Sequence, residues 1–138
     1  MKTTLKLLTA VCMAGLFFSS CKKKDSTVFQ TTLQNLQYKW TFDKEYYHDV
    51  YPGTDFRDTT LGVAGDYFDF RTDNKAYLKV GPYMDTSAYY LLGDTKIVFS
   101  TFNDTVDIQV LNGTNLQMYN RSDYAPSSYD ETTDFLHR

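Results

Sequence analysis

The sequence predicts an all-β protein: an eight-stranded antiparallel up-and-down barrel with a short N-terminal helix. Three observations support this fold class. Aromatic residues make up 17% of the 138 residues, and large rings favour strands over helices. From about residue 38 onward, apolar residues alternate with polar ones in short runs. Turn-forming pairs such as Gly93-Asp94 and Asn112-Gly113 separate these runs, so antiparallel hairpins are expected.

The composition is that of a globular domain without a cationic surface. Hydrophobic residues account for 42% of the chain and charged residues for 22%, which disfavours a disordered or low-complexity protein. The formal net charge is −3, and the longest basic run is Lys22 to Lys24. Because phosphate binding requires a cationic face, we expect no nucleic-acid partner.

The first 20 residues have the layout of an export signal. Lys2 and Lys6 are followed by an uncharged stretch of 12 residues, 7–18, which is shorter than the roughly 20 residues of a membrane-spanning helix. The run FSSC, which ends at Cys21, and the KKKD that follows it resemble the lipobox of bacterial lipoproteins. This resemblance implies cleavage before Cys21 and a cysteine that carries acyl chains such as palmitate.

The lipobox resemblance predicts a membrane-anchored lipoprotein of the cell envelope. Residues 1–20 are then the signal peptide, 21–25 a lipidated tether and 26–138 the domain, and the acyl chains hold the protein to the membrane. Lys22 stands where many enteric lipoproteins of the inner membrane have Asp, which favours the outer membrane. The alternative is ordinary secretory cleavage, which leaves Cys21 as a free thiol.

The segment from Ser26 to Leu36 has the spacing of a short helix. Phe29, Leu33 and Leu36 recur at intervals of four and three residues, and Ser26 is a suitable N-cap. This apolar stripe either packs on the end of the domain or binds a partner. Because an isolated helix of this length is unstable in water, packing is the favoured interpretation.

Eight short strands follow, and each alternates apolar and polar residues. A long polar segment, His48 to Val63, separates the first two, and we expect it to be a loop that serves as a lid or variable segment. The expected strands cover residues 38–47, 66–71, 75–80, 86–92, 96–101, 106–110, 116–118 and 131–137.

The short connections favour a closed barrel over other all-β arrangements. No helix-length segment separates the strands, which excludes parallel βαβ units. Eight strands can close into a barrel and so remove the exposed edges of the sheet. The alternative is a two-sheet sandwich, whose Greek-key crossings need longer connections than most of those in this sequence.

Several segments together resemble the lipocalin-like domain of small bacterial lipoproteins. They are the short helix, a Trp on the first strand (LQYKW, 36–40), the YFDFRTDN and VLNGTNLQMY hairpins, a central tyrosine strand and a last strand ending DFLHR. The resemblance implies a lipocalin-like barrel over the mature chain. Tyr38 stands where the lipocalin Gly-x-Trp motif has Gly, so the ligand pocket of the animal carriers is not implied.

The sequence contains no recognisable catalytic or metal-binding pattern. Its histidines, His48 and His137, have no carboxylate or cysteine at metal-ligand spacing. The acid pairs Asp43 with Glu45 and Asp66 with Asp69 lie on polar strand faces, where solvated carboxylates are expected. We therefore expect a protein that is not an enzyme and has no cofactor.

Alternation predicts which side chains face the barrel interior, where they either line a pocket for a small apolar ligand or fill a plain core. Arg71, Lys79 and Arg121 fall on the outward phase, and Lys44 is the cation on the inward phase. Any ligand is therefore expected to be neutral or weakly polar. The predicted interior positions are Trp40, Phe42, Lys44, Phe68, Phe70, Leu78, Tyr90, Phe99, Ile108, Val110 and Met118.

A second hypothesis is a non-enzymatic interaction module with a filled core. Exposed tyrosines could then contact glycan or a protein partner. They gather in two segments, one with Tyr46, Tyr47 and Tyr51 and one with Tyr83, Tyr89 and Tyr90. An interior cavity favours the carrier, and a filled core with a tyrosine patch beside the long loop favours the module.

Overall fold

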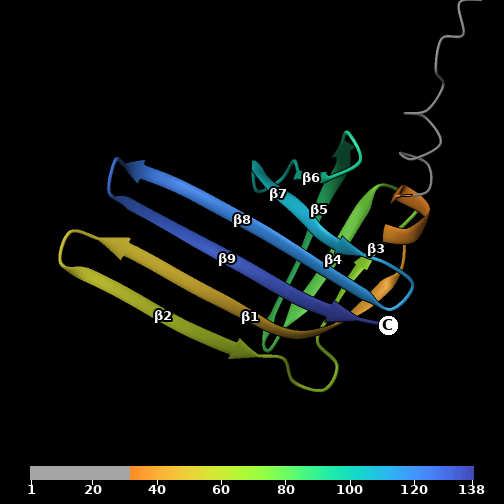
Figure 1. Cartoon of the computed structure of the whole chain (residues 1–138). Helices are drawn as coiled ribbons and strands as arrows, with labels where there is room; N and C mark the ends of the chain where they lie inside the picture. Colours follow the sequence, from red (N-terminus) through yellow and green to blue (C-terminus); the bar gives the residue numbers. More distant parts are fainter. Residues whose placement is uncertain (1–31) are drawn as a thin grey trace, which may run out of the picture.

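The computed structural model describes residues 32–138, which form a closed antiparallel barrel of eight strands with one further strand outside it (Figure 1). Cys21, the signal, the tether and residues 26–31 of the expected helix lie outside the described residues. The nine strands are β1 (Lys39–Tyr51), β2 (Thr54–Leu61), β3 (Tyr67–Phe70), β4 (Lys75–Val80), β5 (Tyr83–Leu92), β6 (Lys96–Phe99), β7 (Asp104–Leu111), β8 (Asn115–Ala125) and β9 (Ser128–His137).

β1 closes the barrel because it pairs on both of its edges. Its first residues, Lys39 to Thr41, pair with β3, and its other edge pairs with β9 from Thr41 to Val50. The neighbours from β3 to β9 follow in chain order, each antiparallel to the next. The predicted eight-stranded barrel is confirmed, and the alternative sandwich is not the fold.

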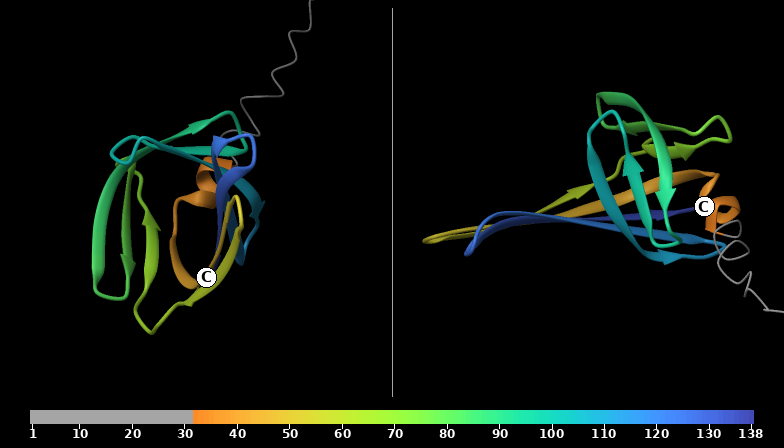
Figure 2. Two further views of the ribbon diagram at one scale, coloured as in Figure 1. Left: turned by 90° about the vertical axis from the view of Figure 1, so that its left-hand side faces the viewer. Right: turned by 90° about the horizontal axis from the view of Figure 1, so that it is seen from above.

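The long strands continue beyond the barrel as a four-stranded sheet in the order β2-β1-β9-β8. We call this part, residues 46–59 and 119–133, the extension. It projects from one end of the barrel as a thin layer, which is clearest in the right-hand view of Figure 2. The turns at its far end connect β1 to β2 and β8 to β9 (Figure 1).

The predicted loop from His48 to Val63 is wrong, because most of this segment is a hairpin. β1 runs on to Tyr51, a turn with Gly53 at a φ of +83° follows, and β2 returns alongside it. All eight residues of β2 are exposed. Because neither face of this strand is buried, its sequence carries no apolar alternation from which a strand could be recognised.

The core fills the barrel, and a helical turn lies across the end opposite the extension (Figure 2). This turn covers residues 32–36, and its Leu33 and Leu36 pack against the core, as the packing interpretation predicts. Trp40 donates a hydrogen bond from Nε1 to the carbonyl oxygen of Leu36 at 2.9 Å. The Arg138 guanidinium lies over the rings of Tyr38 and Trp40, 3.6 and 4.8 Å from their centres.

Candidate functional site

Most of the predicted interior side chains lie in the core. Five are buried and three are partly buried against them: Trp40, Phe42, Phe70, Phe99 and Met118 in the first group, Phe68, Leu78 and Ile108 in the second. The rings contact one another, with centres 5.2 Å apart for Phe70 and Tyr89 and 5.6 Å apart for Phe42 and Phe68. These side chains therefore act as packed core.

Three predicted interior positions are wrong: Lys44, Tyr90 and Val110 are exposed. The strand registers shift between Phe42 and Lys44 and again between Ile108 and Val110. Each bulge inserts one residue, so the next side chain emerges on the opposite face. Lys44 thus lies outside, with its Nζ 4.7 Å from the centre of the Phe135 ring.

Tyr90 has a different cause, because β5 contains no bulge. Tyr89 is 2% exposed and Tyr90 is 54% exposed, so the inward phase is that of Ser87, Tyr89 and Leu91. Two adjacent tyrosines followed by two adjacent leucines fit either phase equally well. The sequence therefore does not show which face of this strand is the buried one.

The barrel opens where the extension begins, around a cavity of about 250 Å³. Burial, with the charges of Glu45 and Asp104, raises the pKa of Asp134 to about 7. Burial and Asp58 raise the pKa of Glu45 as well. The lining residues are Glu45, Asp104, Val106, Met118, Tyr119, Asn120, Thr132 and Asp134.

One face of the extension continues the interior surface of the barrel, and we call it the inner face. Glu45 lies opposite Asp134, which lies opposite the core residue Met118, so these three share a face. Alternate residues beyond them stay on that face. They are Tyr47, Asp49 and Tyr51 on β1, Thr54, Phe56 and Asp58 on β2, Asn120 and Ser122 on β8, and Asp130 and Thr132 on β9.

Aromatic rings form two pairs on the inner face. The Tyr51 and Tyr124 rings are stacked at an interplanar angle of 21°, with their centres 6.5 Å apart. The Tyr47 and Phe56 rings also lie 6.5 Å apart. Tyr51, Phe56 and Tyr124 are exposed. The rings therefore offer flat apolar surfaces near the far end of the extension.

Carboxylates lie among these rings. Asp49 and Asp130 are opposite each other on β1 and β9, and the Oδ1 atom of each is buried without a hydrogen-bond partner. The Asp130 carboxylate raises the pKa of the Tyr124 hydroxyl to about 12, and Asp49 raises the pKa of Tyr51. Among the inner-face positions just given there is no Lys or Arg, so the face is anionic and aromatic.

The opposite, outer face of the extension holds a buried histidine, His48, which the sequence places at the start of the expected loop. His48 is 7% exposed, and its Nδ1 lies 2.9 Å from Glu131 Oε1 while its Nε2 lies 3.0 Å from Asp55 Oδ1. Tyr119 donates a hydrogen bond from its hydroxyl to Glu131 at 2.9 Å. These contacts lower the pKa of Glu131, chiefly through His48, and link β1, β2, β8 and β9.

The acid pairs singled out in the sequence do not act as pairs. Asp43 Oδ1 lies 2.6 Å from His137 Nδ1, whereas Glu45 faces the barrel mouth. The prediction that Asp66 is solvated is wrong, because it is 2% exposed and accepts hydrogen bonds from the backbone N–H groups of Val63 and Gly81, both at 2.9 Å. Asp66 therefore holds two loops together.

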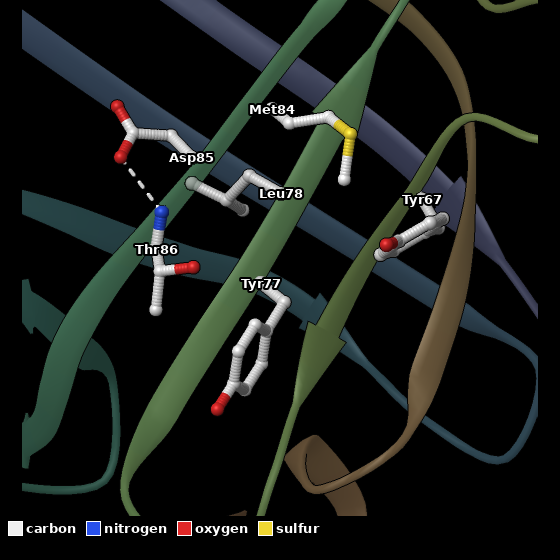
Figure 3. A pocket seen from close by; sticks show the side chains of 6 residues that line it. All are labelled: Tyr67, Tyr77, Leu78, Met84, Asp85 and Thr86. Atoms are coloured by element: carbon white, nitrogen blue, oxygen red, sulfur yellow. Dashed lines mark hydrogen bonds between the residues drawn. The ribbon is translucent and has the colours of Figure 1, made fainter.

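A shallow groove lies on the barrel away from the extension, where β3, β4 and β5 meet (Figure 3). Its volume is about 310 Å³. Met84 is largely exposed, and the Asp85 carboxylate accepts a hydrogen bond from the Thr86 N–H at 2.7 Å. The residues that line this groove are Tyr67, Tyr77, Leu78, Met84, Asp85 and Thr86.

The tyrosines of the interaction hypothesis are distributed between several surfaces. Tyr47 and Tyr51 lie on the inner face, and Tyr46 lies on the outer face of the same strand. Tyr83 is exposed on the barrel and Tyr89 belongs to the core. Phe56 and Tyr124 were not predicted, since Phe56 reaches Tyr47 only through the β1–β2 hairpin and Tyr124 reaches Tyr51 only through the pairings of β1 with β9 and of β9 with β8.

Within residues 32–138, no group of three His, Cys, Asp or Glu side chains is placed to hold a metal ion. The same residues include no helix with the length and hydropathy needed to cross a membrane. No family model, curated protein or solved structure matches the chain.

Proposed function

We propose that the chain is a lipid-anchored cell-envelope protein whose lipocalin-like barrel serves as a scaffold, and whose extension recognises a neutral glycan through its inner face. The observation that carries this proposal is the pairing of exposed rings, Tyr51 with Tyr124 and Tyr47 with Phe56, around the carboxylates of Asp49 and Asp130.

Aromatic rings and carboxylates together match the chemistry of a sugar. A pyranose presents apolar C–H faces that can lie on an aromatic ring, and its hydroxyl groups can donate hydrogen bonds to carboxylate oxygens. Asp49 and Asp130 place two carboxylates on the inner face, opposite each other and beside the rings. An anionic glycan would be repelled by the same carboxylates, which is the reason to propose a neutral one.

The scaffold role is supported by the packing of the barrel. The rings at the predicted interior positions contact one another instead of surrounding a large space. The cavity at the mouth, about 250 Å³, is smaller than the roughly 300–1,000 Å³ of most ligand pockets.

The expected lipid anchor is compatible with recognition by the extension. The described chain begins with the helical turn at one end of the barrel, and the extension projects from the other end (Figure 1). The described chain therefore enters the domain at the end that lies away from the paired rings.

Binding of named oligosaccharides tests the proposal. We expect cellotetraose, maltotetraose or chitotetraose, titrated into the mature chain purified in detergent, to shift the NMR signals of residues around Tyr51 and Tyr124. Replacing both tyrosines with Ala should abolish the shifts, whereas Tyr83→Ala, on the exposed barrel surface, should leave them unchanged. Shifts centred elsewhere, or none with any of the three sugars at millimolar concentration, would overturn the proposal.

A second candidate function is carriage of a small neutral ligand at the barrel mouth. The cavity there includes the apolar side chains of Val106 and Met118 beside its carboxyl groups. Native mass spectrometry of the purified protein should then detect a bound small molecule, and Met118→Trp, which fills the cavity, should remove it. Protein that carries no such molecule before and after the substitution would leave only the glycan proposal.

A further inference from the structure

β2 is the outermost strand of the extension, and within residues 32–138 it pairs only with β1. The Gly62 N–H, just after the strand, donates to the Asp43 carbonyl of β1 at 2.8 Å. Because backbone direction alternates along a strand, even-numbered residues of β2 direct their N–H and C=O groups toward β1. The odd-numbered residues, from Asp55 to Leu61, direct theirs to the open edge, which can accept another strand.

We infer that this edge pairs with β2 of a second copy of the chain, antiparallel and centred on Phe56. In this register, Arg57 of each copy lies opposite Asp55 of the other, which gives two opposite-charge pairs on the outer face. Phe56 lies opposite its counterpart on the inner face, and Thr54 lies opposite Asp58.

Charge complementarity selects this register among the symmetric ones. Centring the pair on Asp55, Arg57 or Asp58 places like charges directly opposite each other, which is unfavourable. Centring it on Thr59 places Arg57 opposite Leu61, and neither acid of the strand is then opposite a base. Only the register centred on Phe56 pairs every Arg57 with an acid.

The inferred pairing goes beyond glycan recognition by one chain. Two four-stranded extensions become one continuous sheet, and their inner faces form a single surface with twice the number of aromatic rings. Two lipid-anchored copies share a membrane surface, so a weak edge contact suffices because the effective concentration is high. A polymeric glycan would then be bound at two places at once.

Disulfide crosslinking in membranes of cells that express the full chain tests this inference. Phe56→Cys places two cysteines directly opposite each other, within the range that a disulfide can bridge, so a covalent dimer should form on mild oxidation. Thr59→Cys is the matched control. Thr59 is exposed on the same strand, but in this register the Thr59 residues of the two copies do not lie opposite each other. The unsubstituted chain sets the background.

Two further variants keep the test independent of the Phe56 ring. Thr54→Cys combined with Asp58→Cys in one chain should also give dimers, since these positions lie opposite each other between copies but about 13 Å apart within one strand. In the Phe56→Cys background, Arg57→Asp should reduce the dimer several-fold, because it places an acid opposite Asp55 of the other copy.

Equal crosslinking of the Phe56→Cys and Thr59→Cys chains, or no crosslinking of either Phe56→Cys or the double cysteine chain, would overturn the inference. An Arg57→Asp chain that crosslinks as fully as its Phe56→Cys parent would overturn the register. None of these results affects glycan binding by a single chain, which the oligosaccharide titration measures separately.

Discussion

Asp49 and Asp130 face each other directly across β1 and β9, and each has a buried carboxylate oxygen without a hydrogen-bond partner. Like charges opposite each other on neighbouring strands destabilise a sheet, so this pair lowers the stability of the extension. Such a cost is typical of residues kept for binding. In the proposed function, this cost is retained because the two carboxylates take part in binding sugar hydroxyl groups.

We predict that Asp49→Asn increases the free energy of unfolding by about 0.5–1 kcal/mol, because it removes one charge of the opposed pair. Urea denaturation at neutral pH measures this change. Asp85→Asn, an exposed position outside the extension, is the control and should change stability by less than about 0.5 kcal/mol. A destabilised Asp49→Asn chain would show that the two carboxylates do not repel each other.

Asp66 is predicted to be the most sensitive carboxylate for folding. Asp66→Ala leaves the N–H groups of Val63 and Gly81 without their acceptor, and the loss of two hydrogen bonds to a buried, charged carboxylate should cost about 3 kcal/mol. The same hydrogen bonds lower the pKa of Asp66. Asp69→Ala, which removes only a contact with the exposed Arg71, should cost less than about 1 kcal/mol in the same urea experiment.

The barrel could be predicted from the sequence because large apolar residues alternate cleanly in most of its strands. Trp40, Phe42 and Phe70 each stand between polar neighbours, and all three are buried. Alternation fails where a strand contains a bulge, because a single inserted residue such as Asp43 has no sequence signature. For this reason the sequence predicts an inward Lys44, whereas the side chain lies outside.

The candidate site was only partly predictable, because it lies outside the core. Tyr47 and Tyr51 were recognised as surface tyrosines, but the stacking of Tyr51 on Tyr124 depends on the pairing of β1 with β9 and of β9 with β8. Phe56 lies in a strand with both faces exposed, so no apolar alternation identifies its strand or its face. Periodicity reports burial on one face, so it cannot locate a strand that has no buried face.

His48 is predicted to control the protonation of Glu131. Its hydrogen bond is the main cause of the lowered pKa of Glu131, so His48→Gln should raise that pKa toward the ordinary value. NMR titration of the glutamate carboxyl signals measures the shift. The substitution should also cost about 1–2 kcal/mol of stability, since His48 is buried between two acids. His137→Gln, at an exposed histidine, is the control and should leave Glu131 unchanged.

Asp134 is predicted to make the protein less stable as the pH rises. Its pKa is about 7 in the folded chain against 3.8 for the free group, so between about pH 4 and 7 the folded state retains a proton that the unfolded chain has lost. Folding stability therefore falls as the pH increases through this window. A shift of this size corresponds to at most about 4 kcal/mol, and we expect about 2–4 kcal/mol between pH 4 and pH 8.

Asp134→Asn should abolish most of this pH dependence, because the neutral amide does not ionise at the mouth of the barrel. The variant should be more stable than the parent chain at pH 8 and similar to it at pH 4, as measured by urea denaturation at both values. Glu131 and Asp66 have lowered pKa values, so they act in the opposite direction and mainly below about pH 4.5. A variant that keeps the parent's loss of stability between pH 5 and pH 8 would show that Asp134 is not the group that titrates there.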